Sequence, residues 1–149
     1  MADPHVATVN WRRDTDSFAV REYNTTYHIA FDGGASLPGS TAPALGGDPS
    51  CVDPEEAFVA ALAGCHMLSF LYCAARAEVV VDAYEDAAEG YMTKAEDKLP
   101  WVSKVTLRPK VTLADPAQAD QLERLHEKAH AMCFIARSVK SEVTIEPAA

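Results

Sequence analysis

Two cysteines that lie far apart in the sequence carry the pattern that points to a reaction. Cys65 sits in a stretch from Ala57 to Ala75 that has no formally charged residue, and Cys133 begins the later run Cys133-Phe134-Ile135-Ala136. A thiolate attacks the O–O bond of a peroxide to give a sulfenic acid, and a second cysteine condenses with that acid to form a disulfide. Two thiols on separate elements therefore suggest two-cysteine redox chemistry.

The apolar surroundings of Cys65 set a condition on that chemistry. Burial alone raises the pKa of a thiol and makes it inert, so a reactive Cys65 needs a cation or hydrogen-bond donors beside it. Apolar walls would favour an alkyl or lipid hydroperoxide over hydrogen peroxide. The alternative from the residues alone is that Cys65 and Cys133 are two inert core cysteines.

The other two cysteines have simpler interpretations. Cys73 follows Cys65 by eight residues on the same expected helix, a rise of about 12 Å. A disulfide needs Cα atoms within about 7 Å, so these two cannot pair, and Cys73 is interpreted as a small buried apolar residue. Cys51 lies in an irregular segment and is interpreted as a loop thiol without a role.

Histidines stand near the expected site, but their spacing does not favour catalysis. His66 follows Cys65 directly, so helical geometry turns its side chain about 100° away, and it is interpreted as a packed core histidine. A Cys–His thioester or ester hydrolase remains an alternative. His126 and His130 are four residues apart, a spacing that can hold a metal. Without a further ligand at suitable spacing, they are predicted to lie on a solvated helix face.

Two helices are expected to position these residues. The first begins at Asp53-Pro54-Glu55-Glu56, where Asp is a good N-cap, Pro suits the first position and acids favour the positive end of the dipole. It should run to about Ala77. Its length is close to that of a membrane span, but its Ala, Gly, His and Ser content favours the core of a soluble fold. Asp115-Pro116 begins the second, amphipathic helix.

Strands are expected around these helices, and Gly33 to Ser50 is expected to be irregular because of its many Gly and Pro residues. Period-two alternation predicts strands, and their order relative to the helices predicts an α+β fold rather than strict α/β alternation. The predicted strands cover residues 6–11, 27–32, 79 toward 91, 102–113 and 141–145.

Composition limits the classes of function. The chain has 149 residues, 48% of them hydrophobic, which fits a single domain over residues 1–149 with a real core. A net charge of -9 argues against a nucleic-acid surface, which needs clustered Lys and Arg. The first residues show no secretory signal, and four irregularly spaced cysteines are typical of cytosolic thiols, so a cytoplasmic protein without a membrane role is expected.

Several segments together resemble the OsmC/Ohr family, the osmotically inducible and organic hydroperoxide resistance proteins. The similarity extends from Trp11 to Pro147, and its motifs stand in the family's order and spacing. The segments are Asp53-Pro54-Glu55-Glu56, Ala61-Leu62-Ala63-Gly64-Cys65-His66-Met67, Val81-Asp82-Ala83-Tyr84-Glu85, Thr106-Leu107-Arg108-Pro109, Cys133-Phe134-Ile135-Ala136 and Val139-Lys140-Ser141-Glu142-Val143.

The resemblance implies a fold and a reaction. The fold would be an intertwined α+β homodimer whose antiparallel sheet wraps the two main helices. The activity would be reduction of organic hydroperoxides without haem, flavin or metal, with electrons from a dithiol or a lipoyl group on another protein. Cys65 would match the peroxidatic cysteine, Cys133 the resolving one and Glu55 the active-site glutamate. About 15 Å of helix separates Glu55 from Cys65, so Glu55 would serve the partner chain's thiol or act through an arginine.

One departure from the family concerns the cation. Relatives usually supply an arginine from the N-terminal strands, but Tyr23 to Gly34 contains none, and Thr25 and Ala30 occupy the expected places. If no arginine reaches Cys65, the expected alternative is a protein of the same fold with little peroxidase turnover that binds apolar small molecules or a protein partner. The remaining candidate cations are Arg12, Arg13, Arg21 and Arg137.

Overall fold

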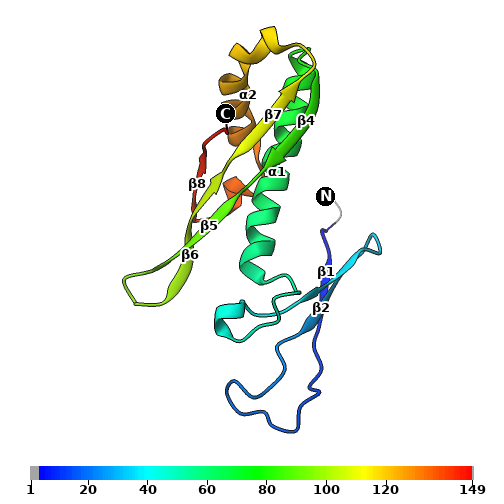
Figure 1. The fold of residues 1–149 in the computed structure, drawn as a ribbon, viewed down its shortest axis with the longest axis vertical. Coiled ribbons are helices and arrows are strands. Elements are labelled where there is room, and N and C mark those ends of the chain that lie inside the picture. Colours follow the sequence, from blue (N-terminus) through cyan, green and yellow to red (C-terminus); the bar gives the residue numbers. More distant parts are fainter. Residues whose placement is uncertain (1–3, 149) are drawn as a thin grey trace. The chain divides into compact units, whose positions relative to one another are not determined.

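The computed structural model describes residues 4–148 (Figure 1). These residues form two compact units, divided between Ala57 and Phe58, and each is described by itself. Strands and helices follow one another in the α+β order that the sequence predicts.

The first unit is built on a small antiparallel sheet. It contains β1 (Ala7–Asn10), β2 (Tyr27–Phe31) and β3 (Ser36–Gly39), paired in that order. The prediction that residues 33–50 are irregular throughout was wrong, since they contain β3 and the 3₁₀ turn η1 (Pro43–Leu45). Gly34, with a φ of 86°, makes the tight turn that folds β3 back onto β2, a conformation that suits glycine.

Helix α1 (Pro54–Arg76) begins where the sequence predicts. The Asp53 side chain accepts a hydrogen bond from the Glu56 N–H at 2.7 Å, and the Glu56 carboxylate accepts one from the Asp53 N–H at 3.1 Å. This reciprocal capping box satisfies two backbone donors that the first helical turn leaves unpaired. The buried stripe of the helix is formed by Leu62, His66, Phe70, Cys73 and Ala74.

α1 is also long and apolar enough to cross a membrane by length and composition, and only 28% of its most apolar window is buried. One helix of this kind is weak evidence for a membrane span, because the core helix of a soluble protein passes the same test. In the second unit this helix packs into two apolar clusters, one around Phe70 and one around Leu62.

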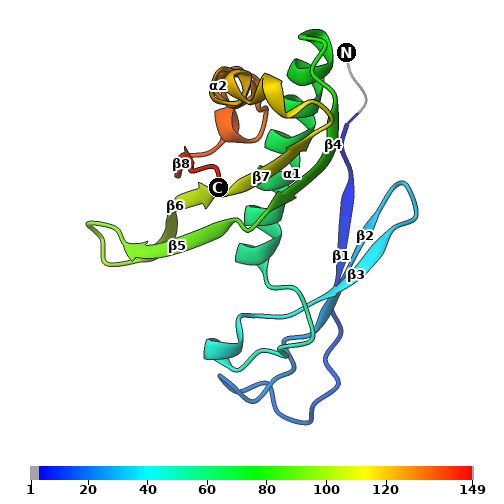
Figure 2. The ribbon, with the colours of Figure 1, turned by 45° about the horizontal axis from the view of Figure 1, so that its top comes forward.

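A long two-stranded ribbon accompanies α1 in the second unit. In Figures 1 and 2, β4 (Val81–Asp86) runs on into β5 (Glu89–Lys94), while β6 (Pro100–Leu107) runs on into β7 (Pro109–Leu113). β4 pairs with β7 and β5 with β6, both antiparallel. The prediction of one continuous strand over residues 102–113 was therefore wrong.

The ribbon is interrupted at Arg108 for a local reason. The Arg108 N–H leaves the ladder and donates to the Asp86 side chain at 2.7 Å, and the next residue is Pro109, which has no N–H to give. The main-chain N–H positions of Arg108 and Pro109 therefore do not continue the hydrogen bonding of β6, and the strand ends at Leu107.

The C-terminal part of the chain completes the second unit. The 3₁₀ segment η2 (Pro116–Gln121), capped by the Asp115 side chain, precedes α2 (Leu122–Met132), and η3 (Ala136–Ser138) follows. The helix predicted at Asp115-Pro116 therefore becomes regular only at Leu122. The last strand, β8 (Glu142–Ile145), pairs in parallel with β6, so that residues 104–107 lie beside residues 142–145.

Candidate functional site: a two-cysteine centre

The second unit brings Cys65 and Cys133 together. Cys65 lies in the middle of α1 and is half-buried, while Cys133 is the C-cap of α2 and is buried. The Cys65 thiol lies close enough to Cys133 to add to the shift in the pKa of Cys133. Both cysteines are free thiols, so the structure corresponds to a reduced dithiol.

The surroundings of Cys133 hold it in the protonated form. Burial, and secondarily the neighbouring Cys65 thiol, raise the pKa of Cys133 to about 11. Main-chain N–H groups act in the opposite direction, and that of Ala136 lies 3.5 Å from the sulfur. Burial wins because two amide dipoles do not replace the hydration that a thiolate loses.

Arg137 is the candidate cation within the unit that holds both cysteines. Its main-chain N–H donates to the Cys133 carbonyl at 3.1 Å, and its side chain is exposed. Among the other arginines of this unit, Arg108 pairs with Glu89 and Glu146, and Arg76 donates to the Tyr72 hydroxyl, while Arg124 of α2 is exposed.

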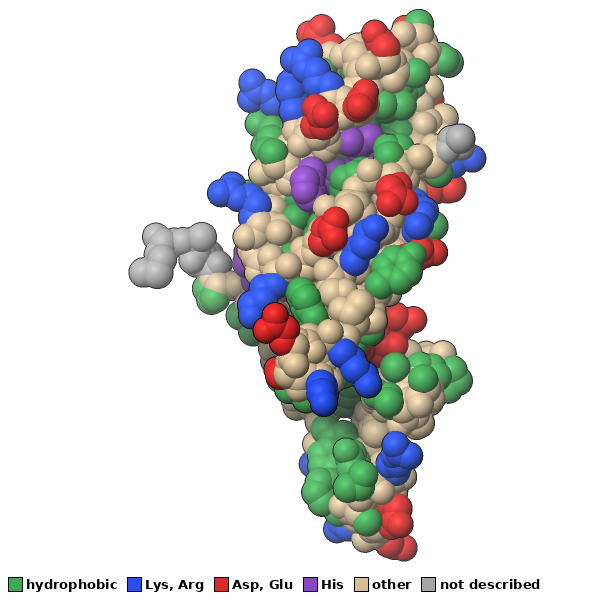
Figure 3. Space-filling model, turned by 90° about the vertical axis from the view of Figure 1, so that its left-hand side faces the viewer, with side chains coloured by type: hydrophobic (Ala, Val, Ile, Leu, Met, Phe, Trp, Pro, Cys, Tyr) green, Lys and Arg blue, Asp and Glu red, His purple; other side chains and the backbone are tan. Residues whose placement is uncertain are grey.

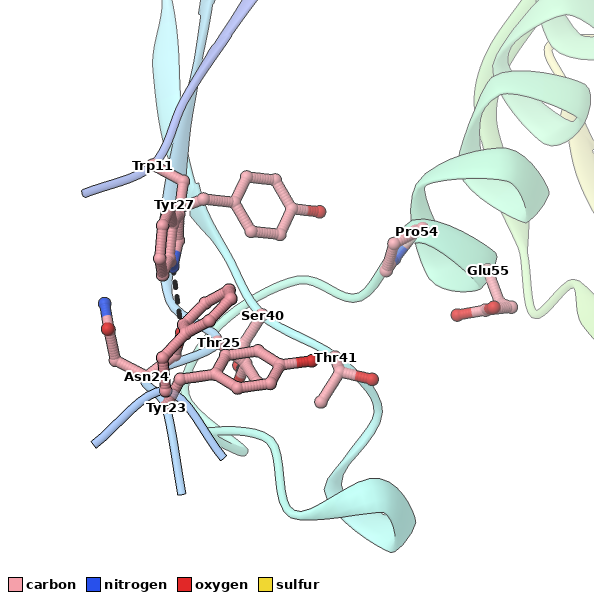
Figure 4. A pocket seen from close by; sticks show the side chains of 10 residues that line it. Trp11, Tyr23, Asn24, Thr25, Tyr27, Ser40, Thr41, Pro54 and Glu55 are labelled. Carbon is pink, nitrogen blue, oxygen red and sulfur yellow. Dashed lines mark hydrogen bonds between the residues drawn. The ribbon is translucent and has the colours of Figure 1, made fainter. Parts of the chain in front are cut away.

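Glu55 lies in the first unit, in the first turn of α1, and it is exposed. It forms part of the lining of a cavity of about 400 Å³ whose other walls are largely aromatic (Figure 4). In Figure 4 the ring of Tyr23 extends toward Thr41, and the Trp11 indole donates to the Asn24 carbonyl at 2.8 Å. The full lining is Trp11, Phe18, Tyr23, Asn24, Thr25, Tyr27, Ser40, Thr41, Pro54 and Glu55.

The N-terminal arginines belong to loops of the first unit. Arg21 has a left-handed backbone conformation with a φ of 67°, and it lines a smaller cavity with Tyr23 and Thr25. Left-handed backbone is strained for a residue with a side chain and is enriched at functional positions. Arg13 donates to the Asp16 carbonyl at 2.8 Å, and Arg12 is exposed.

The prediction of a solvated face was wrong for His126, while His130 is half-buried. His126 is 4% exposed, and its Nδ1 lies 3.1 Å from Nε2 of His66, which is fully buried. His66 is packed in the core as predicted, although its Nδ1 has no hydrogen-bond partner among residues 4–148. The sequence did contain a signal, because the apolar spacing of Leu122, Leu125 and Ala129 places His126 on the same buried face.

The two remaining cysteines lie apart from this centre. Cys73 is 6% exposed, and its thiol donates to the Met132 sulfur at 3.8 Å, so it is the buried apolar residue that the sequence predicts. Cys51 is a half-buried loop residue of the first unit, and its N–H donates to the Asp48 carbonyl.

An α+β subunit with two neighbouring free cysteines, one in the long helix and one at the end of the second, defines a class of thiol protein. A family model described as OsmC-like protein matches residues 47–148. An OsmC-like protein of unknown function from Vibrio cholerae is 40% identical, with a TM-score of 0.91 over 99% of this chain and 100% of its own. The chain belongs to the OsmC-like family.

More distant structures agree on the fold. An organic hydroperoxide resistance protein from Elizabethkingia anophelis is 17% identical, with a TM-score of 0.72 over 99% of this chain and 95% of its own. The organic hydroperoxide resistance protein OhrB of Bacillus subtilis is 21% identical, with a TM-score of 0.69 over 98% of each chain. A search among curated proteins found no match.

Proposed function

We propose that the protein reduces organic hydroperoxides to alcohols through Cys65 and Cys133. The observation that carries the proposal is that two cysteines 68 residues apart in the sequence (133 − 65) are neighbouring free thiols. Family membership and the names of two distant structural neighbours, both organic hydroperoxide resistance proteins, support the same reaction.

The reaction proceeds in three balanced steps. The Cys65 thiolate attacks the outer oxygen of ROOH, the O–O bond breaks, and the alkoxide leaves and takes a proton to become ROH. The Cys133 sulfur then attacks the sulfenic acid of Cys65, forms an S–S bond and releases water. A dithiol, such as a dihydrolipoyl group on another protein, finally reduces the disulfide and is itself oxidised to a disulfide.

The division of roles follows from burial. Cys65 is the more exposed of the two thiols, so it is the one that a peroxide reaches, and Cys133 is fully enclosed and protonated. Thiolate chemistry at Cys65 requires a positive group, for which Arg137, Arg21, Arg12 and Arg13 are the candidates. Glu55 is proposed to serve the partner chain's Cys65 or to act through an intervening arginine.

The decisive experiment measures consumption of cumene hydroperoxide with dihydrolipoamide as reductant. Cys65→Ser should abolish turnover, and Cys133→Ser should stop it after one equivalent and leave a sulfenic acid detectable by dimedone. Cys73→Ser is the matched control in the same helix and should keep activity. Full turnover by Cys65→Ser would exclude the mechanism.

Glu55→Gln should lower turnover while leaving the free energy of unfolding within about 0.5 kcal/mol of wild type.

A second function is favoured by a separate observation. The aromatic cavity of the first unit, at about 400 Å³, has the size and apolar lining of a small-molecule site. A protein that binds an apolar ligand there without turnover would give saturable quenching of Trp11 fluorescence by cumyl alcohol and no peroxide consumption. The Tyr23→Ala variant should lose that quenching.

The assembly and location that we propose are those of a cytoplasmic homodimer. α1 carries exposed apolar side chains at Leu68 and Tyr72, and beyond α2 the ring of Phe134 is 78% exposed. Apolar surface of this kind is typically covered in an oligomer. We do not expect a nucleic-acid partner, because phosphate binding needs clustered Lys and Arg and the net charge of this chain is -9.

A further inference from the structure

Three histidines meet inside the second unit where α1 packs on α2. The ring planes of His66 and His126 differ by only 9°, and their nitrogens approach to 3.1 Å. His130, one turn further along α2, has its ring centre 6.5 Å from that of His66. Figure 3 shows histidine side chains reaching the surface among hydrophobic and acidic ones, and His130 is half-buried where the other two are enclosed.

The histidine pair interrupts the apolar core. His66 lies one helical turn from Leu62 and one from Phe70, which belong to two different buried clusters. Phe70 stacks on the His126 ring with centres 4.3 Å apart. The His66–His126 contact is thus a polar link between the two helices, set between two apolar regions.

This link depends on the protonation of the pair. A hydrogen bond between two imidazoles needs one nitrogen to donate and the other, unprotonated, to accept. The first added proton places a charge in the core, where no acceptor from the described part of the chain lies beside the buried Nδ1 of His66. A second proton makes both facing nitrogens donors and turns the bond into a repulsion.

The same two helices carry the two thiols. Cys65 immediately precedes His66 on α1, and Cys133 ends α2, where its N–H donates to the His130 carbonyl at 3.3 Å. We propose that His66 and His126 are positioning residues that hold α2 against α1 and so keep Cys133 within reach of Cys65. This inference rests on the proposed function for its biological meaning, but the geometry that it predicts can be tested without peroxide.

The direction of the pH effect follows from burial. Burial lowers the pKa of both His66 and His126 to about 4, and for His66 the neighbouring His126 and His130 add to the shift. Unfolded histidine titrates near 6.5, so the unfolded chain binds more protons between these values. The stabilisation is complete above pH 6.5 and is lost as pH falls toward 4, by up to about tenfold in the unfolding constant per pH unit and histidine.

The other titratable groups around the pair do not offset this effect. His130 faces it from α2, and Tyr84 of β4 reaches it through Phe70, whose ring centre is 5.7 Å away. Among residues 4–148, no carboxylate contributes to the pKa shift of either histidine.

Phenylarsine oxide tests the inference, because it forms a stable cyclic adduct only with two thiols that are close together. The protein would carry Cys51→Ser and Cys73→Ala, and adduct formation would be followed by intact mass between pH 7.5 and 3.5. The protein with the unaltered histidine pair should lose bridging progressively as pH falls toward 4, where both histidines titrate. His126→Asn, whose side-chain oxygen accepts in place of Nδ1 without titrating, should retain bridging to a lower pH than the parent, because His66 alone is left to take a proton. His28→Gln, which removes an exposed histidine, is the matched control and should behave as the parent.

A structural variant completes the test. His126→Leu removes the polar link and should reduce bridging at least fivefold at pH 7.5, and His126→Asn should rescue it. The inference is overturned if His126→Asn shows the same acid loss as the parent, or if bridging by a folded His126→Leu is unchanged. If His126→Leu does not fold, the Asn profile alone decides. A protein that bridges as predicted but consumes no peroxide would uphold the positioning role and refute the peroxidase.

Discussion

Cys133 and its burial determine how the proposed reaction should respond to pH. With a pKa of about 11, this thiol is ionised in about one molecule in ten thousand at pH 7. In the proposed mechanism the peroxide reacts at Cys65, so the pKa of Cys133 bears on the second chemical step. Closing the disulfide is the step that needs the Cys133 thiolate.

We therefore predict that disulfide closure accelerates about tenfold per pH unit between pH 7 and 9, because the thiolate fraction grows tenfold per unit below the pKa. Single-turnover reactions with one equivalent of peroxide, quenched with N-ethylmaleimide and analysed by mass, give this rate. The rate of the first step, followed in Cys133→Ser, is measured in parallel as the control for the reaction with peroxide. A closure rate that is flat over this range would contradict the buried, protonated state of Cys133.

At the level of single residues, some parts of the candidate site could be predicted from the sequence and others could not. The two cysteines were singled out by their places in the sequence and given roles by the family resemblance, and the proximity of the thiols is visible only in the structure. The role of Glu55 came from the resemblance alone and stays a prediction. The histidine pair was missed because its two members are 60 residues apart and each looks ordinary in its own helix. A hydrogen bond across a tertiary contact leaves no local pattern in a sequence.

At the scale of elements, the start of α1 was the most predictable feature because its determinants are all local. Asp53, Pro54 and Glu56 specify the cap within four residues, and the structure confirms the reciprocal hydrogen bonds. The ribbon was harder to predict: the break at Arg108 depends on Asp86, which lies 22 residues earlier. Alternation of apolar and polar residues alone cannot distinguish one long strand from two consecutive strands that continue in the same direction.

We predict that Asp53→Ala lowers the free energy of unfolding by about 1 kcal/mol, because the variant leaves the first-turn N–H of Glu56 without its acceptor. Urea unfolding monitored by circular dichroism measures this change. Asp82→Ala, an exposed carboxylate on β4, is the control and should alter stability by less than about 0.5 kcal/mol. Equal stability of Asp53→Ala and wild type would show that the cap is not needed once tertiary packing holds the helix.

At the scale of the whole molecule, the exposed apolar side of α1 bears on assembly. Leu68 is 64% exposed and Tyr72 51% exposed, one helical turn apart, in a helix whose opposite stripe is buried. A second copy of the chain would remove these side chains from water at about 25 cal/mol per Å² of apolar surface. This is the physical reason for proposing a homodimer.

We predict that the wild-type protein is a dimer at micromolar concentration and that Leu68→Glu is a monomer, because the variant places a charge in the buried face of the proposed interface. Light scattering after size exclusion gives the mass directly. Leu99→Glu makes the same change at an exposed position between β5 and β6 and should leave the mass unaltered. A monomeric wild-type protein, or a dimeric Leu68→Glu variant, would refute the proposed interface.

The parallel pairing of β8 with β6 has a consequence for folding during synthesis. Residues 104–107 leave the ribosome before residues 142–145, so their pairing partner is not yet available when they emerge. Until β8 is added, the edge of β6 that it will cover exposes unpaired backbone N–H and C=O groups to other nascent chains. Any shortened product that ends before Glu142 keeps this edge open permanently, so premature termination would yield an aggregation-prone species rather than a smaller working subunit.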